Sequence, residues 1–311
     1  MSRPSISALI TYHNEGVLLT RCLRSFLNQP VCEIVVCDDA SSLPPHEFIP
    51  AAPFPIRTIR NEVNLGPAKS RNRLISESRG DFVHFHDSDD WVLPTWGEKV
   101  LERVREGYEA IFSEVSSFKN GDLYVQKVQG LELSLLADPA AFAIGHFLLV
   151  PSGTYQKKLL ESIGGYPTQL WQSEDYYFHV RLLAREPRIA VILEPLVGID
   201  LREKGRSQEK KQVWGSTLEA LRRLESELPS RYRPIISDAA FRVGSTLYVE
   251  GAIELAREAF GFAYSVGSPN IHRNALYRWL AQIDPILAER VGRCYRNLIP
   301  RSFRAKIQRL G

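Results

Sequence analysis

The chain has 311 residues, of which 44% are hydrophobic and 24% charged, with a formal net charge of +3. This balance is typical of a globular protein and excludes a disordered or low-complexity chain. No run approaches the roughly 18 uncharged apolar residues of a membrane-spanning helix, and residues 1–6 lack a signal peptide's hydrophobic core. Because the four cysteines show no paired metal-ligand spacing, we expect reduced thiols and a cytoplasmic protein.

Short apolar runs alternate with helical patterns through the first half of the chain. Such alternation predicts an α/β fold with a mostly parallel central sheet that is covered on both faces. The predicted strands are residues 6–11, 33–38, 56–60 and 81–85, and the predicted helices are residues 17–29 and 67–79.

The second half begins with strands from about residue 108, with a turn at 120–122. Helices are expected near 156–162 and 175–185, and a last core strand at 189–193.

Beyond about residue 208 the chain is almost entirely helical in pattern, after a charged stretch at 202–211. We therefore expect an α/β domain over residues 1–208 and a helical C-terminal domain over 209–311. The last part of that domain is a basic tail, since residues 290–311 hold seven Arg or Lys and no acid.

The basic tail interleaves apolar and cationic residues from Leu298 to Leu310. Such an amphipathic segment could lie on an anionic membrane surface. It could equally be a solvated helix that covers the helical domain. Nucleic acid is a weaker third option, because no binding module accompanies the basic residues.

Three carboxylates, Asp87, Asp89 and Asp90, follow the apolar run at 82–85 within four positions. Like charges this close repel one another, and hard oxygen ligands suit Mg²⁺ or Mn²⁺. Such a metal commonly carries a diphosphate, although a solvated acidic loop would have the same sequence. In parallel sheets ligands bind beyond the carboxyl ends of strands, where this cluster is expected to lie.

Taken in order, six motifs make the chain resemble the inverting glycosyltransferases of family 2, which have the GT-A fold. Each motif alone is weak, and their order and spacing make the combination specific. The resemblance covers roughly residues 4–208, and its motifs are residues 8–15, 33–42, 64–72, 85–90, 163–166 and 173–183.

The resemblance implies a divalent metal, Mn²⁺ or Mg²⁺, at the Asp-Ser-Asp triplet. Asp89 matches the direct metal ligand, and Asp87 matches the contact to the ribose or to a metal-bound water. Asp90 could belong to the metal shell or touch the sugar, or it could cap the helix expected to begin near Pro94.

The resemblance also implies a set of donor-binding residues at the ends of the first strands. Asp39 matches a carboxylate that accepts the imide N–H of uracil, and Tyr12 matches a residue able to stack on the nucleotide. The other donor-binding residues are Thr11, Glu15, which could reach the ribose, and the basic Arg71.

Structural roles are the simpler interpretation for several neighbouring residues. Asp38 could satisfy backbone donors of the turn that follows it. His84 and His86 share one face of a strand, where packing is commoner than metal binding, and Lys69 is expected to be a solvated helix charge.

For the catalytic base the resemblance points to Asp175, with Glu174 as the alternative base or an acceptor contact. Asp175 could also simply stabilise the start of a helix through the dipole. Trp171 and Trp91 could be acceptor-binding surfaces for sugar rings, but two core tryptophans would give the same sequence.

One segment departs from the family pattern. Relatives often carry a histidine three residues before a serine after the last core strand, and here Lys204 stands there, three residues before Ser207. Lysine is not a metal ligand at neutral pH, so we expect Lys204 or Arg206 to bind the diphosphate directly from a loop that closes over the donor.

These features together predict a cytoplasmic inverting glycosyltransferase, peripheral at the inner membrane face if the tail binds lipid. It would move one sugar from a nucleotide diphosphosugar, a UDP-sugar above all, to a hydroxyl of a glycan, a lipid-linked sugar or a protein. The helical domain could recognise the acceptor, form a homodimer or bind the membrane.

Two other classes stay open. A sugar-1-phosphate nucleotidyltransferase is disfavoured, because residues 11–16 lack the glycine-rich basic loop that it needs after the first strand. A non-catalytic nucleotide-sugar-binding or scaffold protein is the main alternative, since binding residues can persist without turnover.

Overall fold

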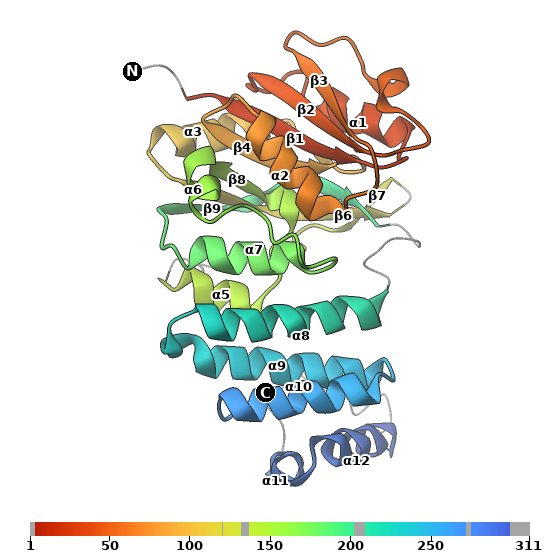
Figure 1. Cartoon of the computed structure of the whole chain (residues 1–311), viewed down its shortest axis with the longest axis vertical. Helices are drawn as coiled ribbons and strands as arrows, with labels where there is room; N and C mark the ends of the chain where they lie inside the picture. Colours follow the sequence, from red (N-terminus) through yellow and green to blue (C-terminus); the bar gives the residue numbers. More distant parts are fainter. Residues whose placement is uncertain (1–3, 120, 132–136, 202–208, 272–274, 299–311) are drawn as a thin grey trace. The chain divides into compact units, whose positions relative to one another are not determined.

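The chain divides into two compact units, Met1–Gln208 and Glu209–Gly311, in a computed structural model (Figure 1). The structure describes residues 4–119, 121–131, 137–201, 209–271 and 275–298. Predictions that concern Lys204, Arg206 and the tail beyond residue 298 lie outside these residues.

In the first half of unit 1 the predicted alternation of strands and helices is confirmed. The largest difference in a boundary is at α1, which ends at Ser25, because Phe26–Gln29 form turns ahead of Pro30 instead of a further helical turn. The elements are β1 (Ile6–Tyr12), α1 (Val17–Ser25), β2 (Glu33–Asp39), β3 (Ile56–Asn61), α2 (Pro67–Glu77) and β4 (Phe82–Asp87).

The second half of unit 1 adds strands that complete the sheet. The last of them, β9, runs to Asp200 and is longer than predicted, because its register against β6 shifts near Pro195 and the strand then continues. The elements are β5 (Trp91–Val92), α3 (Trp96–Arg105), β6 (Ala110–Lys119), β7 (Asp122–Val125), α5 (Pro139–Gly145), β8 (Gly153–Gln156), α6 (Lys157–Ser162), α7 (Glu174–Leu183) and β9 (Ile189–Asp200).

The strands form one mixed sheet in the order β3-β2-β1-β4-β8-β6-β9-β5, with β7 paired to β6. The four strands from β3 to β4 are all parallel, as predicted, and β6 is parallel to β9. The short strand β8 joins the two parallel groups in the antiparallel sense. The predicted α/β fold is confirmed.

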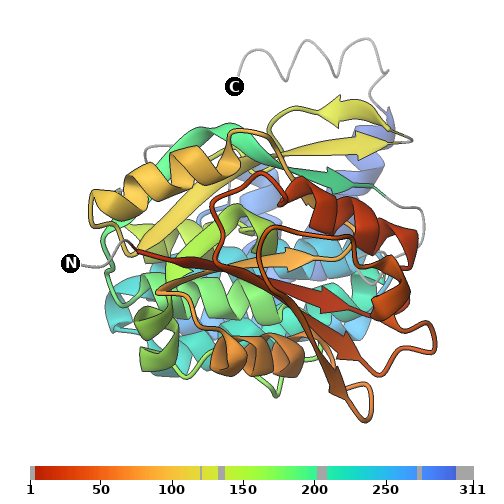
Figure 2. The same cartoon turned by 90° about the horizontal axis from the view of Figure 1, so that it is seen from above.

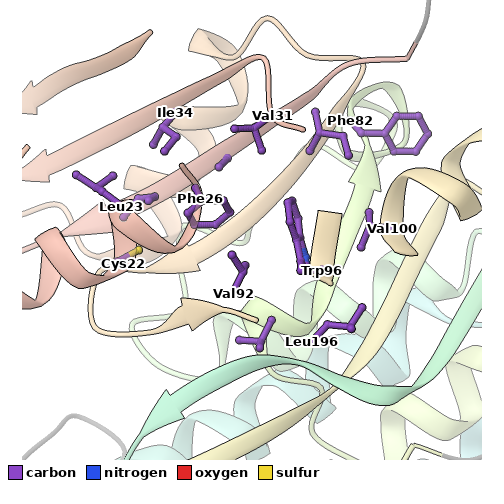
Figure 3. Close-up of a cluster of buried hydrophobic side chains, with 14 of the residues drawn as sticks. Cys22, Leu23, Phe26, Val31, Ile34, Phe82, Val92, Trp96, Val100 and Leu196 are labelled. Atoms are coloured by element: carbon purple, nitrogen blue, oxygen red, sulfur yellow. The ribbon is translucent and has the colours of Figure 1, made fainter. Parts of the chain in front are cut away.

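Helices cover both faces of this sheet (Figure 2). On one face, α1 and α3 bury a cluster that includes Leu23, Phe26, Trp96 and Val100 against alternate residues of β1 and β2 (Figure 3). On the other face, α2 packs against the same two strands. Burial on both faces explains why residues 34–37 form a continuous apolar run.

The packing predicted for the two histidines of β4 is also confirmed. His84 and His86 are buried, and both rings lie edge-on to Phe26, with centroids at 6.1 and 5.4 Å. Burial lowers the pKa of His86 to about 3, so this imidazole stays neutral at physiological pH.

The secondary-structure elements of unit 2, within its described residues, are all helices, as the sequence predicted. Helices α8, α9 and α10 pack side by side, and α11 and α12 pack on each other (Figure 1). No helix in the described part of the chain is long and apolar enough to cross a membrane. The helices are α8 (Lys210–Glu227), α9 (Arg233–Val249), α10 (Ile253–Val266), α11 (Ala275–Ile283) and α12 (Pro285–Leu298).

Candidate functional site

The parallel register brings the carboxyl ends of four strands to one edge of the sheet. Thr11 of β1 lies opposite Cys37 of β2 and opposite Asp87 of β4. At the next step outward, Asp39 of β2 lies opposite Asn61 of β3. The polar residues predicted at separate strand ends therefore share one edge, where ligands of such sheets bind.

Asp39 holds the loop that leads into α2. Its Oδ1 accepts hydrogen bonds from Asn61 Nδ2 and Leu65 N, both at 2.8 Å, and its Oδ2 accepts one from Gly66 N at 2.9 Å. A carboxylate has about four acceptor positions, so one remains on Oδ2. The side chain is only 6% exposed, and a ligand would have to approach it closely.

Asp38 has the structural role that was the simpler interpretation. Its Oδ1 accepts a hydrogen bond from Ser41 N at 2.9 Å, and its Oδ2 pairs with Arg60 of β3. The Arg60 guanidinium also donates to Ser41 O at 2.9 Å. Asp38 and Arg60 together fix the turn that follows β2.

Tyr12 does not offer its ring for stacking. The side chain is 1% exposed and belongs to the core cluster, and its hydroxyl donates to Leu43 O at 2.7 Å and accepts from Gly16 N at 3.3 Å. Burial of the ring corrects the expectation of a nucleotide-stacking tyrosine. Tyr12 instead ties the loop after β1 to the loop after β2.

Glu15 links the loop after β1 to the acidic segment after β4. Its Oε2 accepts hydrogen bonds from His13 N at 2.6 Å and from Ser88 Oγ at 3.0 Å. Ser88 is the middle residue of the Asp-Ser-Asp triplet. Glu15 therefore lies at the predicted site, and part of its carboxylate already serves to position the triplet.

Arg71 is the buried centre of an ion network. Its Nη2 donates to Asp87 Oδ1 at 3.0 Å and its Nη1 donates to Glu174 Oε1 at 2.9 Å, while Thr11 Oγ1 also donates to Asp87 Oδ1 at 2.9 Å. Arg71 is 4% exposed and lies over the ring of Tyr166 at 5.2 Å. The guanidinium thus joins the end of β4 to the start of α7.

Asp175 lies in the first turn of α7, next to that network. Burial and the adjacent Glu174 carboxylate raise the pKa of Asp175 to about 7, although Arg71 and a hydrogen bond from Tyr176 N oppose the shift. A carboxylate with a pKa near the working pH is suited to take a proton from a weak acid such as a hydroxyl. Glu174 is less suited, because its Oε1 is already paired with Arg71.

The acidic triplet can be tested for its fit to a divalent metal. Within the ranges that the structure describes, no group of three or more His, Cys, Asp or Glu side chains forms a protein-only metal cage. Mg²⁺, however, is usually held by one or two carboxylates together with substrate phosphates and waters. Asp87 and Asp89 are half-buried at one strand end and fit that mode of binding.

Asp90 is buried and its N–H donates to Asp87 O at 3.1 Å. The structure rules out the idea that it caps the next helix, because α3 begins at Trp96 with Thr95 as its N-cap residue. Asp90 therefore remains part of the turn that shapes the triplet.

The two tryptophans lie in different surroundings. Trp91 packs against β9, with Arg21 over its ring at 4.2 Å and the Phe118 ring at 4.9 Å. Trp171 is 58% exposed, and its indole lies over Gly66, where an added Cβ would be 3.1 Å from the ring. Trp171 is therefore the better candidate for a surface on which a sugar or base could stack.

Backbone strain gathers around the same loops. Asn14, Ala40 and Ser173 have φ angles of 69°, 59° and 58°, and each lies directly beside a predicted site residue. Among the non-glycine residues of the described chain, Glu186 alone has a positive φ away from the site. Strain of this kind is common where a fold holds functional groups in place.

Sequence reasoning gave no role to Asn61 and Tyr166, although both support the site. Asn61 donates to Asp39, and Tyr166 stacks on Phe178 with centroids at 3.9 Å and also lies under the Arg71 guanidinium. The sequence could have indicated Asn61, because it directly follows the strand predicted at residues 56–60. Tyr166 is the last residue of the motif at 163–166, to which the sequence assigned no function.

Comparison with known families gives one assignment for this region. Residues 7–183, more than half of the chain, match the family model described as glycosyl transferase family 2. The matched range includes every site residue described above.

Individual relatives agree with that match. An uncharacterised glycosyltransferase of Haemophilus influenzae is 31% identical over 203 residues, which cover 61% of this chain and 66% of that protein, just under two thirds of its length. A Campylobacter jejuni protein named GalNAc(5)-diNAcBac-PP-undecaprenol beta-1,3-glucosyltransferase is 26% identical over 72% of this chain and 75% of its own length.

Solved structures extend the likeness of the fold. Residues 1–349 of S. aureus TarS, crystallised with UDP-GlcNAc, superpose with a TM-score of 0.67 at 19% identity, covering 94% of this chain and 92% of that one. At this identity the likeness establishes the fold, which is the one that the sequence predicted.

Proposed function

Because the chain belongs to glycosyl transferase family 2, we propose that it moves a single sugar, with inversion, from a UDP-sugar to a hydroxyl acceptor. One observation carries this proposal: Arg71 joins the strand end that would face the donor, at Asp87, to the helix start that holds Asp175. Donor and proton acceptor would then be held by one rigid network.

The nucleotide would be recognised at the end of β2. The remaining acceptor position of Asp39 suits the imide N–H of uracil, and the other three are occupied by fixed donors that hold the carboxylate in place. The S. aureus protein of like fold was crystallised with UDP-GlcNAc, which supports a nucleotide-sugar donor of this class. The sugar itself stays undetermined.

In the transfer step, the carboxylate of Asp175 would accept the proton of the acceptor hydroxyl. The hydroxyl oxygen forms a bond to the anomeric carbon, the bond from that carbon to the diphosphate breaks, and UDP leaves with the electron pair. The pKa near 7 of Asp175 supports this role, since the group is then both substantially ionised and basic at neutral pH.

Asp89 and Asp87 would hold a divalent cation, Mn²⁺ or Mg²⁺, together with the diphosphate oxygens. When bound, such a cation would neutralise the charge that develops on the departing diphosphate. Lys204 or Arg206 would add a direct contact to the same phosphates.

The acceptor would approach beside Trp171, whose exposed indole can stack on a sugar ring. The name of the Campylobacter relative mentions an undecaprenol-linked saccharide, which makes a lipid-linked glycan one candidate among glycan, lipid-linked and protein hydroxyls. A cytoplasmic location, homodimer formation and membrane contact of residues 290–311 remain predictions.

A panel of UDP-, GDP- and dTDP-sugars with Mn²⁺ tests the proposal, read out by thermal shift and by slow donor hydrolysis in the absence of acceptor. We expect stabilisation by the UDP-sugars and hydrolysis of one of them. Calorimetry of UDP binding with and without Mn²⁺, on the parent and Asp89→Ala, tests the metal separately, and equal affinities in all four titrations would refute it.

The alternative of a non-catalytic nucleotide-sugar-binding protein makes a different prediction. It expects donor binding without hydrolysis or transfer, and full biological function in Asp175→Asn. The absence of a thermal shift with every nucleotide sugar would contradict the enzyme and favour a non-catalytic scaffold protein.

A further inference from the structure

A row of large apolar side chains is exposed on α11 of unit 2. Leu276, Trp279 and Ile283 are 58%, 58% and 62% exposed, and their spacing of three and four residues places them on one face of the helix. Single exposed apolar residues are ordinary on protein surfaces, but a continuous row that includes a tryptophan usually marks a contact surface.

The opposite side of α11 already attaches the helix to the rest of unit 2. Tyr277 is 5% exposed and its hydroxyl bonds to Glu289 of α12, while Ala281 is fully buried and its carbonyl accepts a hydrogen bond from Tyr264 of α10 at 2.8 Å. The exposed row is therefore not needed to hold the helix in place. It is a second apolar face.

The charges of these helices are predominantly positive. Arg278 of α11 and Arg290 and Arg293 of α12 are exposed, and residues 290–311 hold seven basic residues and no acid. The two acids of the region serve inside the fold: Asp284 accepts hydrogen bonds from backbone N–H groups at the start of α12, and Glu289 is buried against Tyr277.

We propose that the exposed face of α11, with the arginines of α11 and α12, docks on an anionic lipid bilayer. Trp279 would lie at the level of the headgroups, where tryptophan is favoured, with Leu276 and Ile283 in the upper acyl region. The arginines would bind lipid phosphates, and the attraction would weaken with salt. This docking goes beyond sugar transfer and does not depend on which donor is used.

A second copy of the chain is a poorer occupant for the same face. A two-fold symmetric dimer places the same surface on both partners, so two helix pairs of predominantly positive charge would be brought together. Like charges opposed across an interface disfavour association. An anionic surface, by contrast, complements both the apolar row and the positive charge of these helices.

Co-sedimentation of the full chain with vesicles tests this docking. We compare phosphatidylcholine alone with an equimolar mixture of phosphatidylcholine and phosphatidylglycerol, and expect binding to the anionic mixture only. The double variant Leu276→Gln, Trp279→Gln should lower vesicle partitioning by at least about tenfold, because each substitution removes a large apolar side chain from the interface. Arg278→Gln with Arg290→Gln should remove most of the salt dependence.

The matched control is Leu123→Gln with Tyr124→Gln on β7, whose side chains are similarly exposed at 56% and 64%. This variant should sediment with anionic vesicles like the parent. Circular dichroism and UDP binding of all variants separate a docking defect from misfolding or from failure of the donor site.

Three results would overturn the docking surface. They are no binding of the parent to anionic vesicles, unchanged binding of the Leu276, Trp279 double variant, or a dimer of the parent in solution that this double variant abolishes. The last result would assign the same face to a second copy of the chain.

Discussion

Two groups of acids at the same sheet edge are neutralised in opposite ways. Asp39, the last residue of β2, accepts hydrogen bonds from neutral donors, two backbone N–H groups and the amide of Asn61. Asp87 and Glu174 pair with the buried cation Arg71, which also lowers the pKa of the neighbouring Asp175. The first arrangement surrounds one carboxylate with hydrogen-bond donors, and the second places three acidic groups around one cation.

The surplus of acidic groups around Arg71 accounts for part of the raised pKa of Asp175. A carboxylate whose oxygens accept several fixed hydrogen bonds can serve as a rigid acceptor for recognition. In the second group, burial and the neighbouring charge push the pKa of Asp175 upward, so that this residue can exchange a proton near neutral pH. In the proposed function, recognition by Asp39 and proton transfer by Asp175 would therefore be separated along one edge of the sheet.

Replacement of Asp175 by Asn should have the largest effect, because it removes the proton acceptor while keeping the shape. We expect sugar transfer to fall by about 100- to 10,000-fold, the usual contribution of a general base, with UDP affinity unchanged. Transfer assays and calorimetry measure the two quantities. The control is Glu161→Gln, an exposed acid on α6, which should leave both unchanged.

The stability of the same variant has a definite sign. The folded state raises the pKa of Asp175 from 3.8 to about 7, so it holds the proton more tightly than the unfolded chain does. The parent should therefore lose stability as the pH rises through that window. Asp175→Asn should lack this loss and be at least as stable as the parent at pH 8, and a less stable variant would contradict the assignment.

Removal of the shared cation is the next largest effect. In Arg71→Met the buried Glu174 loses its partner, and breaking a buried ion pair in this way typically costs about 3 kcal/mol of unfolding free energy. Urea denaturation measures the loss. Lys69→Met, on the exposed side of the same helix, should cost almost nothing, and an equal loss in both variants would show that Arg71 is not the centre of the network.

Asp39→Asn tests the other group of acids. Asparagine keeps the size but turns one acceptor into a donor, which cannot face all three of the present N–H groups. Because hydrogen bonds to a charged group contribute more than neutral ones, we expect a loss of about 2 kcal/mol in unfolding free energy and weaker UDP binding. Asp38→Asn should also destabilise the fold, but the folded variant should bind UDP as tightly as the parent does.

The pH dependence of sugar transfer also tests the role of Asp175. Since Asp175 must be ionised to accept a proton and its pKa is about 7, the rate should rise with pH up to that value and fall about tenfold per unit below it. Arg71 lowers the pKa of Asp175. Arg71→Lys should therefore leave the acidic limb of the pH–rate profile near pH 7, and Arg71→Met should shift this limb to higher pH. A limb near pH 4 would mean that the pKa of the base is not raised, and would contradict the effect of burial and Glu174 on Asp175.

Much of this edge could be predicted from the sequence, because parallel strands bring their carboxyl ends together wherever they lie in the chain. The strand-end positions of Thr11, Asp39 and Asp87 follow from apolar periodicity alone. The burial of Tyr12 could also have been predicted, since it shares the alternate positions of Ile6, Ala8 and Ile10 in β1, all of which face the core.

The central role of Arg71 could not be predicted in this way. Its two partners lie 16 and 103 residues away in the sequence, on a strand end and on a helix start. No local sequence pattern predicts that a cation on α2 lies between Asp87 and Glu174. The same holds for Trp171, because only the folded chain shows that its indole lies over Gly66 while Trp91 packs against β9.

Gly66→Ala should have the smallest effect. It tests whether Trp171 acts together with the loop at Leu65 and Gly66 that Asp39 holds. Gly66 donates its N–H to Asp39 and has a φ of +81°, a conformation that costs an alanine about 1 kcal/mol. The added Cβ would lie 3.1 Å from the Trp171 ring and displace the indole. We expect Gly66→Ala to lose about 1 kcal/mol of unfolding free energy and to show a several-fold higher KM for the acceptor.

Gly121→Ala separates these two causes. Gly121 has a similar φ of +88° but has no atom within 4 Å of its added Cβ, so it carries the backbone strain without the contact. If the indole contributes to acceptor binding, both variants lose similar stability and only Gly66→Ala raises KM. A KM that stays unchanged in Gly66→Ala would mean that Trp171 merely covers the loop held by Asp39.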